Sequence, residues 1–167
     1  MTAKLISTRD LEGIQISYTD ALLQGLAPDG GLYVPVEYPQ LTIGELVNLK
    51  SLSYSELAFE VKRKLIGGAI PDEVLKELLQ NAYEEGKFNT KNGNTVPIQA
   101  IGEDLFLENL SLGPTAAFKD MALQQLGQEM NYELKNRGGN LVILGATSGD
   151  TGSSAESAVK GLNRIKL

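Results

Sequence analysis

After residue 95 the apolar pattern alternates between short strand-like runs and longer runs at helical spacing, and this alternation constrains the fold more than any other feature. A strand-helix-strand succession of this kind indicates a parallel sheet with right-handed crossovers. In open sheets of this type, ligands bind beyond the carboxyl ends of the strands. The predicted elements are, in order, strands at 96–101 and 105–110, a helix to Asn136, a strand at 141–144, a helix at 151–160 and a strand at 163–167.

The preceding part of the chain has a different pattern, in which helices predominate. Its predicted elements are strands at 5–9 and 14–18, a short helix to Gln24, a loop through Pro39, and helices that open at Thr42, Ser53 and Pro71, the last ending at Gly86. Thr42 and Ser53 each precede a glutamate by the spacing of a capping box. We therefore expect an α/β chain in which a mainly helical N-terminal domain at 1–94 is followed, at 95–167, by the truncated start of a parallel-sheet domain of β-α-β-α-β order.

Composition excludes several classes of function. The 167 residues include no cysteine and no histidine, which removes disulfides and thiolate chemistry and argues against a metal site. The net charge of −6 argues against nucleic acid as a partner. No stretch approaches the length of a membrane span, and the start lacks the apolar core of a signal peptide. We expect a cytoplasmic protein without a membrane partner.

Lys119 is the candidate catalytic residue, because it falls on the expected buried stripe of a helix. The apolar positions that continue this stripe are Ala122, Leu123, Leu126, Met130 and Leu134. Thr115 is the expected N-cap, so the ammonium would lie in the first turn, where the helix dipole disfavours positive charge. A partly neutral amine is a nucleophile that can form a Schiff base with an aldehyde. The alternative is a lysine whose stem packs on apolar residues while its amine reaches water.

A second unusual stretch is 145–154, which is rich in glycines and small hydroxyl residues and directly follows the apolar run at 141–144. It predicts a strand-to-helix turn whose backbone N–H groups and hydroxyls point one way, forming an anion site suited to carboxylate or phosphate. An ordinary tight turn with Asp150 or Thr151 as N-cap explains part of this composition, but not the whole stretch. The spacing matches neither a Walker A motif nor G-x-G-x-x-G.

Together with three earlier motifs, these two stretches resemble the threonine synthases, which are pyridoxal-phosphate enzymes of the tryptophan-synthase-β-like group. The motifs that carry the resemblance lie at Ser7-Thr8-Arg9, 25–35, 53–58, 113–120 and 145–152. Several long motifs in the family's order indicate the N-terminal portion of such an enzyme. The family's glycine-rich loop for the cofactor phosphate comes from sequence downstream of this portion.

The resemblance implies that Lys119 binds pyridoxal 5'-phosphate covalently and is catalytic. It implies that Asp150 and Thr147 contact the cofactor. The positions implied to face the substrate are Thr147, Ser148, Gly149 and Thr151. Asp150 stands where sister enzymes commonly have an asparagine, and an aspartate donates the corresponding hydrogen bond only when protonated. Leu112 stands where the family often has a histidine, so general acid-base catalysis by imidazole is excluded within this chain.

The reaction implied by the resemblance is the conversion of O-phosphohomoserine and water to threonine and phosphate, carried out by a carbon-oxygen lyase of threonine biosynthesis. Its substrate is a small phosphorylated amino acid, and the full-length form could be a homo-oligomer, whereas this portion alone is expected to be inactive. One alternative is another enzyme of the group, such as a threonine or serine dehydratase or a cysteine synthase, against which the segment 25–35 argues. The other alternative is a catalytically silent homologue that binds a small anionic ligand or a partner chain.

Overall fold

The chain forms two compact units. The computed structural model describes residues 3–84, 86–88 and 94–167. Unit 1 comprises Met1–Leu52 and Glu56–Glu77, and unit 2 comprises Ser53–Ser55 and Leu78–Leu167. The predicted division into domains at 1–94 and 95–167 stays a prediction, because residues 89–93 beside that boundary lie outside the described ranges.

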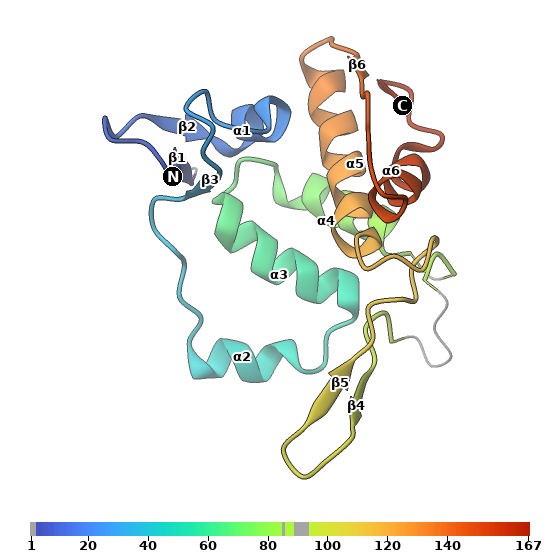
Figure 1. Ribbon diagram of the computed structural model, residues 1–167. Helices are drawn as coiled ribbons and strands as arrows, with labels where there is room; N and C mark the ends of the chain where they lie inside the picture. Colours follow the sequence, from blue (N-terminus) through green and yellow to red (C-terminus); the bar gives the residue numbers. More distant parts are fainter. Residues whose placement is uncertain (1–2, 85, 89–93) are drawn as a thin grey trace. The chain divides into compact units, whose positions relative to one another are not determined.

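Unit 1 contains a three-stranded antiparallel sheet of order β2-β1-β3 together with helices (Figure 1). The first seven elements of the chain are β1 (Lys4–Ser7), β2 (Gln15–Ser17), α1 (Tyr18–Gln24), β3 (Tyr33–Pro35), α2 (Ile43–Leu49), α3 (Tyr54–Ile66) and α4 (Asp72–Ala82). The two predicted strands and the short helix to Gln24 are confirmed. The predicted loop through Pro39 is wrong in one respect, since it contains β3.

A turn at Asp29 explains why β3 forms within that segment. The Ser7 hydroxyl on β1 donates a 2.7 Å hydrogen bond to Asp29 Oδ1, which also accepts from the Gly31 amide at 2.8 Å. The Gly31 amide, and then the Ser7 hydroxyl, lower the pKa of Asp29. A Cβ added to Gly31 would overlap the Ser7 hydroxyl, so the close approach requires glycine. The motif at 25–35 therefore brings β3 alongside β1.

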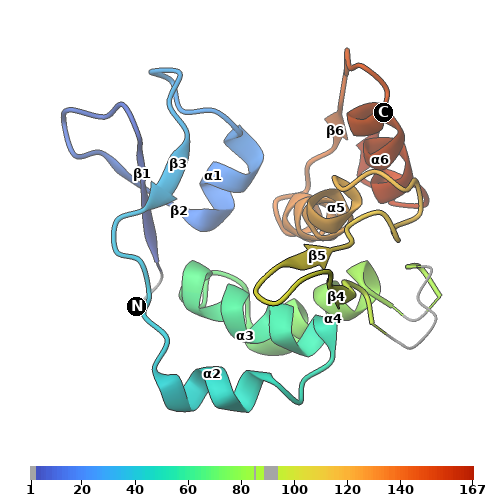
Figure 2. The same ribbon diagram turned by 60° about the horizontal axis from the view of Figure 1, so that its bottom comes forward.

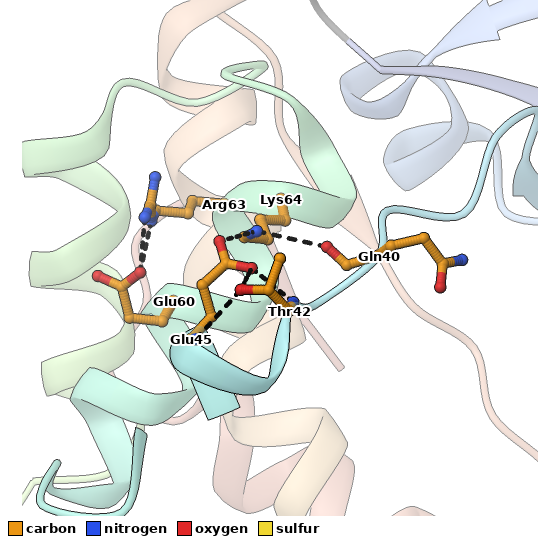
Figure 3. Close-up of polar contacts among 6 residues, drawn as sticks. All are labelled: Gln40, Thr42, Glu45, Glu60, Arg63 and Lys64. Atoms are coloured by element: carbon orange, nitrogen blue, oxygen red, sulfur yellow. Dashed lines mark hydrogen bonds and ion pairs between the residues drawn. The ribbon is translucent and has the colours of Figure 1, made fainter. Parts of the chain in front are cut away.

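A polar cluster joins α2 to α3 within unit 1 (Figure 3). The predicted capping box at Thr42 is confirmed: its hydroxyl accepts from the Glu45 amide at 3.2 Å, and Glu45 Oε2 accepts from the Thr42 amide at 2.8 Å. Lys64 on α3 forms an ion pair with the other carboxyl oxygen of Glu45. The hydrogen bond from Lys64, followed by those from Thr42, lowers the pKa of Glu45 to about 2. One side chain thus caps α2 and fastens it to α3.

The helix predicted from Pro71 is α4, which buries Leu75, Leu79 and Ala82 completely. These residues recur at helical spacing, so one side of the helix is buried. The helix ends at Ala82, earlier than the predicted end at Gly86. Within the described ranges, no helix combines the length and the apolar character needed to cross a membrane.

Unit 2 contains one parallel β-α-β unit and one hairpin. Its further elements are β4 (Ile98–Ala100), β5 (Phe106–Glu108), α5 (Asp120–Asn136), β6 (Leu141–Val142), α6 (Asp150–Val159) and β7 (Ile165–Lys166). The parallel pairing of β6 with β7 across α6 is confirmed. The prediction of one sheet in β-α-β-α-β order is wrong, because β5 pairs antiparallel with β4 in a separate sheet (Figure 2). The connection at 101–105 is far shorter than the crossover of about a dozen residues that a parallel pair needs.

Most of the residues that α5 buries are polar, which contradicts the predicted apolar stripe. Its buried residues are Asp120, Gln124, Gly127, Glu129, Glu133 and Leu134. Of the predicted stripe, Leu134 is buried, but Ala122 and Leu126 are exposed. The α6 surface that packs on α5 (Figures 1 and 2) presents hydroxyl groups, which accounts for the burial of Asp120 and Gln124. Gln124 Nε2, for example, donates to the Ser157 hydroxyl at 3.2 Å. Glu133 lies on another side of α5 and is bonded to Arg137 of the same helix.

Candidate functional site

Lys119 lines a cavity of about 400 Å³ in unit 2. Cavities that bind small molecules range from about 300 to 1,000 Å³ and are mostly apolar with a few polar groups. The apolar part of this lining includes Leu110, Phe118 and Met121, whereas Lys119, Tyr54 and Thr151 contribute the amine and two hydroxyls. The cavity therefore has the size and the character of a small-molecule site.

Lys119 occupies the junction between the loop 113–118 and α5. It is the N-cap residue, with φ −64° and ψ −19°, and its carbonyl accepts from the amides of Ala122 and Leu123. Its ammonium lies 4.6 Å from the centroid of the Phe118 ring, a cation–π distance, and the residue is half-buried. The predicted position on a buried stripe in the first turn is therefore corrected. Lys119 precedes the first turn and faces a cavity.

Asp120 organises the loop before Lys119. Asp120 Oδ2 accepts from the Thr115 amide and Oδ1 accepts from the Thr115 hydroxyl, both at 2.8 Å. The predicted N-cap at Thr115 is wrong for this reason, since both donors of Thr115 serve Asp120 and the helix begins later. From α6, the Ser154 hydroxyl donates to Asp120 Oδ1 at 2.6 Å. Asp120 is 0% exposed, although it is not among the apolar positions of the predicted stripe.

The second predicted stretch forms the exposed loop between β6 and α6. The Thr147 hydroxyl accepts from the amides of Gly149 and Gly152, both at 3.1 Å. It therefore satisfies amides at the start of α6, the task that the alternative of an ordinary tight turn gave to Asp150 or Thr151. The N-cap residue is neither of these, because α6 begins at Asp150 with Gly149 as its N-cap residue, at φ 132°.

The structure brings part of the predicted site together. Lys119 and Thr151 line the same cavity. Outside that lining lie Thr147, Ser148 and Gly149 of the loop and Asp150 at the start of α6, all of them exposed. The roles predicted for all these residues stay predictions.

Tyr54 is a residue of the cavity that the sequence did not indicate. Its ring meets the Tyr83 ring edge to face, with centroids 4.8 Å apart, and the Tyr83 hydroxyl donates to the Met121 carbonyl at 2.6 Å. Burial, and then the charge of Glu108, raise the pKa of Tyr54, and burial likewise raises that of Tyr83. In the sequence Tyr54 is part of a helix-capping motif, and only tertiary packing places it beside Lys119.

A larger cavity of about 660 Å³ lies in unit 1, against β1, β2 and the Asp29 turn. Its lining includes Arg9, Asp10 and Asp29. None of the predicted site residues contributes to it. We therefore take the smaller cavity, which contains Lys119, as the candidate site.

Comparisons with known proteins cover nearly the whole chain. Residues 4–83 match the family model described as threonine synthase N terminus. A threonine synthase of Corynebacterium glutamicum is 46% identical over 166 residues, which cover 97% of this chain and 34% of that protein. A threonine synthase of Saccharomyces cerevisiae is 38% identical over 171 residues, which cover 96% of this chain and 33% of that protein. The chain spans about a third of the length of these relatives.

Solved structures agree with the sequence relatives. The crystal structure of a threonine synthase from Brucella melitensis with bound pyridoxal phosphate matches with a TM-score of 0.89 and 41% identity, over 98% of this chain and 34% of that chain. The yeast threonine synthase structure matches with a TM-score of 0.87 and 35% identity, over 97% of this chain and 34% of that chain. The mixed α/β architecture therefore corresponds to about a third of each of these structures.

Proposed function

This chain belongs to the threonine synthase family, and we propose that it contributes Lys119 and the loop 147–151 to the active site of a threonine synthase. The reaction is the conversion of O-phosphohomoserine and water to threonine and phosphate, with pyridoxal 5'-phosphate as cofactor. The observation that carries this proposal is the position of Lys119 in a small-molecule cavity that also contains Thr151. Because the chain spans about a third of its relatives, the proposed activity belongs to an enzyme of their length.

The cavity suits the ring and the aldehyde of pyridoxal phosphate. Leu110, Phe118 and Met121 provide apolar surface for a planar ring, and the Lys119 amine lies at the same cavity. When bound, the cofactor supplies an aldehyde that takes up the substrate amine and a ring that stores electrons. Among the described residues of this lining, Lys119 is the only charged one. The partners of the cofactor phosphate are therefore proposed to come from the part of the enzyme that corresponds to the remaining length of the relatives.

Lys119 has two proposed tasks. Its amine binds the cofactor aldehyde, and once released it moves protons at the α and β carbons of the substrate. The half-buried position beside Phe118 limits hydration of the amine while leaving it accessible from the cavity. Lys119 therefore serves as the catalytic residue of the proposed reaction.

The loop 147–151 is proposed to receive the substrate carboxylate. The Thr147 oxygen accepts from two amides, so its hydrogen remains for donation to a carboxylate. Ser148 and Thr151 add two further hydroxyls, whereas the Gly149 amide must leave Thr147 before it can bind substrate. Asp150 is proposed to contact the cofactor ring, which requires a protonated carboxyl if Asp150 is the donor.

The relatives do not favour the two alternatives drawn from the sequence. The curated proteins and solved structures described above are named threonine synthases, with no dehydratase or cysteine synthase among those four. The alternative of a catalytically silent protein that binds a small anion rests on the absence of the cofactor-phosphate loop. Because the chain covers only about a third of each relative, that absence is explained equally well by the part of the relatives that the chain does not cover.

Cofactor trapping tests the role of Lys119. Pyridoxal phosphate is titrated into the chain, the product is reduced with borohydride, and the adduct is mapped by mass spectrometry. We expect the adduct on Lys119, its loss in Lys119→Ala, and its retention in the control Lys160→Ala, which removes an exposed lysine of the same unit. An adduct spread equally over Lys119 and Lys160 would contradict the proposal. Phosphate release from O-phosphohomoserine by the endogenous protein, measured in parallel, tests the reaction itself.

A further inference from the structure

We propose that Asp120 is a positioning residue for Lys119, and that its buried carboxyl group fastens the loop 113–118 to α6. The inference rests on the proposed role of Lys119. In this arrangement one carboxyl group fixes the backbone conformation of the loop that leads to Lys119. The same group fixes the position of Lys119 relative to Thr151. Asp120 itself does not touch substrate or cofactor.

Asp120 receives hydrogen bonds from the loop just before it and from α6, which is distant in sequence. Thr115 donates from its amide and its hydroxyl, both at 2.8 Å, and Ser154 donates from α6 at 2.6 Å. Asp120 and Ser154 are both 0% exposed. A buried carboxyl group is tolerated only when hydrogen bonds replace its lost hydration, and three donors do so here. The three hydrogen bonds to Asp120 are therefore part of the buried interior and not a contact at the protein surface.

The loop that Asp120 holds is strained. Ala116 has φ 61°, in the left-handed region that residues other than glycine rarely adopt. A Cβ added to Gly113 would overlap the Asp120 carboxyl group, so the backbone of the loop lies directly against it. Strained residues persist only where the surroundings determine them, and they concentrate at functional sites. The hydrogen bonds of Asp120 supply that constraint between Gly113 and Lys119.

The same carboxyl group links the two halves of the candidate site. Lys119 immediately precedes Asp120, and its carbonyl is engaged by the first turn of α5. Ser154 lies one helical turn after Thr151, the α6 residue that shares the cavity with Lys119. The bond between Ser154 and Asp120 therefore connects the backbone of Lys119 to the helix that bears Thr151.

Competitive amine labelling tests the proposal without depending on the cofactor. The chain is methylated with trace formaldehyde and cyanoborohydride, and the ratio of labelling at Lys119 to that at exposed Lys160 is measured across pH. In Asp120→Ala we expect this ratio to rise above its wild-type value, because the released loop no longer holds the Lys119 amine half-buried beside Phe118. Exchange of the Thr115 amide should quicken by about tenfold or more, since its bond to a carboxyl group is lost. Trapping of pyridoxal phosphate at Lys119 should fall at the same time.

Three variants separate positioning from general loosening. Asp120→Asn is expected to rescue the wild-type ratio, because its amide oxygen can still accept from the Thr115 amide while the Thr115 and Ser154 hydroxyls rotate to accept. Ser154→Ala should raise the ratio by removing only the link to α6. Glu133→Ala is the matched control: it removes another buried carboxyl group of α5, bonded to Arg137 at 2.7 Å, and should leave the ratio unchanged.

Two results would overturn the proposal. One is a wild-type labelling ratio in Asp120→Ala or, if that variant does not fold, in Ser154→Ala. The other is an equal rise of the ratio in Glu133→Ala. A failure of pyridoxal phosphate to label Lys119 in the wild-type chain would instead count against the proposed function, while the formaldehyde ratios would still decide the role of Asp120.

Discussion

The carbonyl oxygen of Ala158 on α6 lies so close to Gly127 on α5 that a Cβ added to the glycine would be 2.8 Å from it. The neighbouring atom is backbone, so it cannot turn aside as a flexible side chain would. This close approach sets the spacing between α5 and α6. Lys119 directly precedes α5, and α6 begins within the segment 147–151. The stability of the helix pair and the geometry of the candidate site therefore depend on the same contact.

Replacing Gly127 with alanine should destabilise unit 2 by about 1–3 kcal/mol, because overpacking forces the helices apart. The matched control is Gly44→Ala on α2, where an added Cβ meets nothing within 4 Å. That change should stabilise α2 by about 0.5–1 kcal/mol through helix propensity. Urea unfolding combined with hydrogen exchange in each unit would measure both effects. Equal changes in the free energy of unfolding for the two substitutions would show that the contact with Ala158 does not limit the size of the residue at position 127.

Replacing Thr147 with valine should loosen the start of α6. The hydroxyl that accepts from the Gly149 and Gly152 amides is lost, at a cost of about 1 kcal/mol, comparable with the loss of a helix cap. Thr147→Ser keeps the acceptor and is the control. We expect faster amide exchange at Gly149 and Gly152 in the valine variant but not in the serine variant. Gly152→Ala should likewise quicken exchange at Gly149, since the added Cβ would lie 2.9 Å from the Thr147 oxygen. Unchanged exchange in both would contradict the assigned bonds.

The ion pair between Glu45 and Lys64 should make unit 1 sensitive to acid. Since the folded-state pKa of Glu45 is lowered from 4.5 to about 2, its stabilising effect is complete above the ordinary pKa and is lost as pH falls from there toward the folded value. The stability difference between wild type and Glu45→Gln should therefore shrink over that interval. Thermal unfolding across pH measures this difference.

Lys64→Met provides the complementary measurement for the same pair. The hydrogen bond from Lys64 is the largest cause of the shift, so the pKa of Glu45 in this variant should rise toward its ordinary value. The capping bonds from Thr42 remain and should keep part of the shift. An NMR titration of the Glu45 carboxyl gives the value directly. A pKa that stays at about 2 would assign the shift to the helix cap alone.

Alkaline titration should show late ionisation of the Tyr54 and Tyr83 phenols. Burial raises the pKa of both phenols above the ordinary value of 10.0. For an acid whose folded-state pKa is raised, the stabilising effect is present below the unfolded pKa and is lost as pH rises above it. Two late-ionising phenols should appear in the absorbance titration, one of which disappears in Tyr83→Phe and the other in Tyr54→Phe. A titration with no late phase would contradict the burial of this ring pair.

Replacing Tyr83 with phenylalanine should also cost about 1 kcal/mol of stability, because its hydrogen bond to the Met121 carbonyl is lost. The packing of its ring on Tyr54 is retained. Tyr38→Phe serves as the control, since Tyr38 is 62% exposed. Thermal unfolding of the chain compares the two substitutions. Equal melting temperatures for both variants would show that the bond to Met121 contributes nothing.

Local signals predicted much of the fold, because their physical basis lies within a few residues. The capping box at Thr42 needs only the backbone of the next turn. The burial of Leu75 and Leu79 follows from apolar spacing on one helix. The β-α-β unit across α6 follows from the alternation of apolar runs. The hairpin of β4 and β5 was missed because strand pairing depends on the partner that the connection can reach.

The sequence by itself determined the family motifs, including the one that contains Lys119, and the hydroxyl-rich segment after β6, since these are properties of residue type and order. Tertiary structure alone decided that Asp120 is buried, because its partner Ser154 lies 34 positions away on another helix. It also decided that Tyr54 lines the cavity of Lys119. Periodicity ranks the faces of a helix by hydrophobicity, whereas burial depends on what packs against each face. On α5 the packing helix α6 offers the Ser154 and Ser157 hydroxyls, so the polar side chains of Asp120 and Gln124 are buried against it.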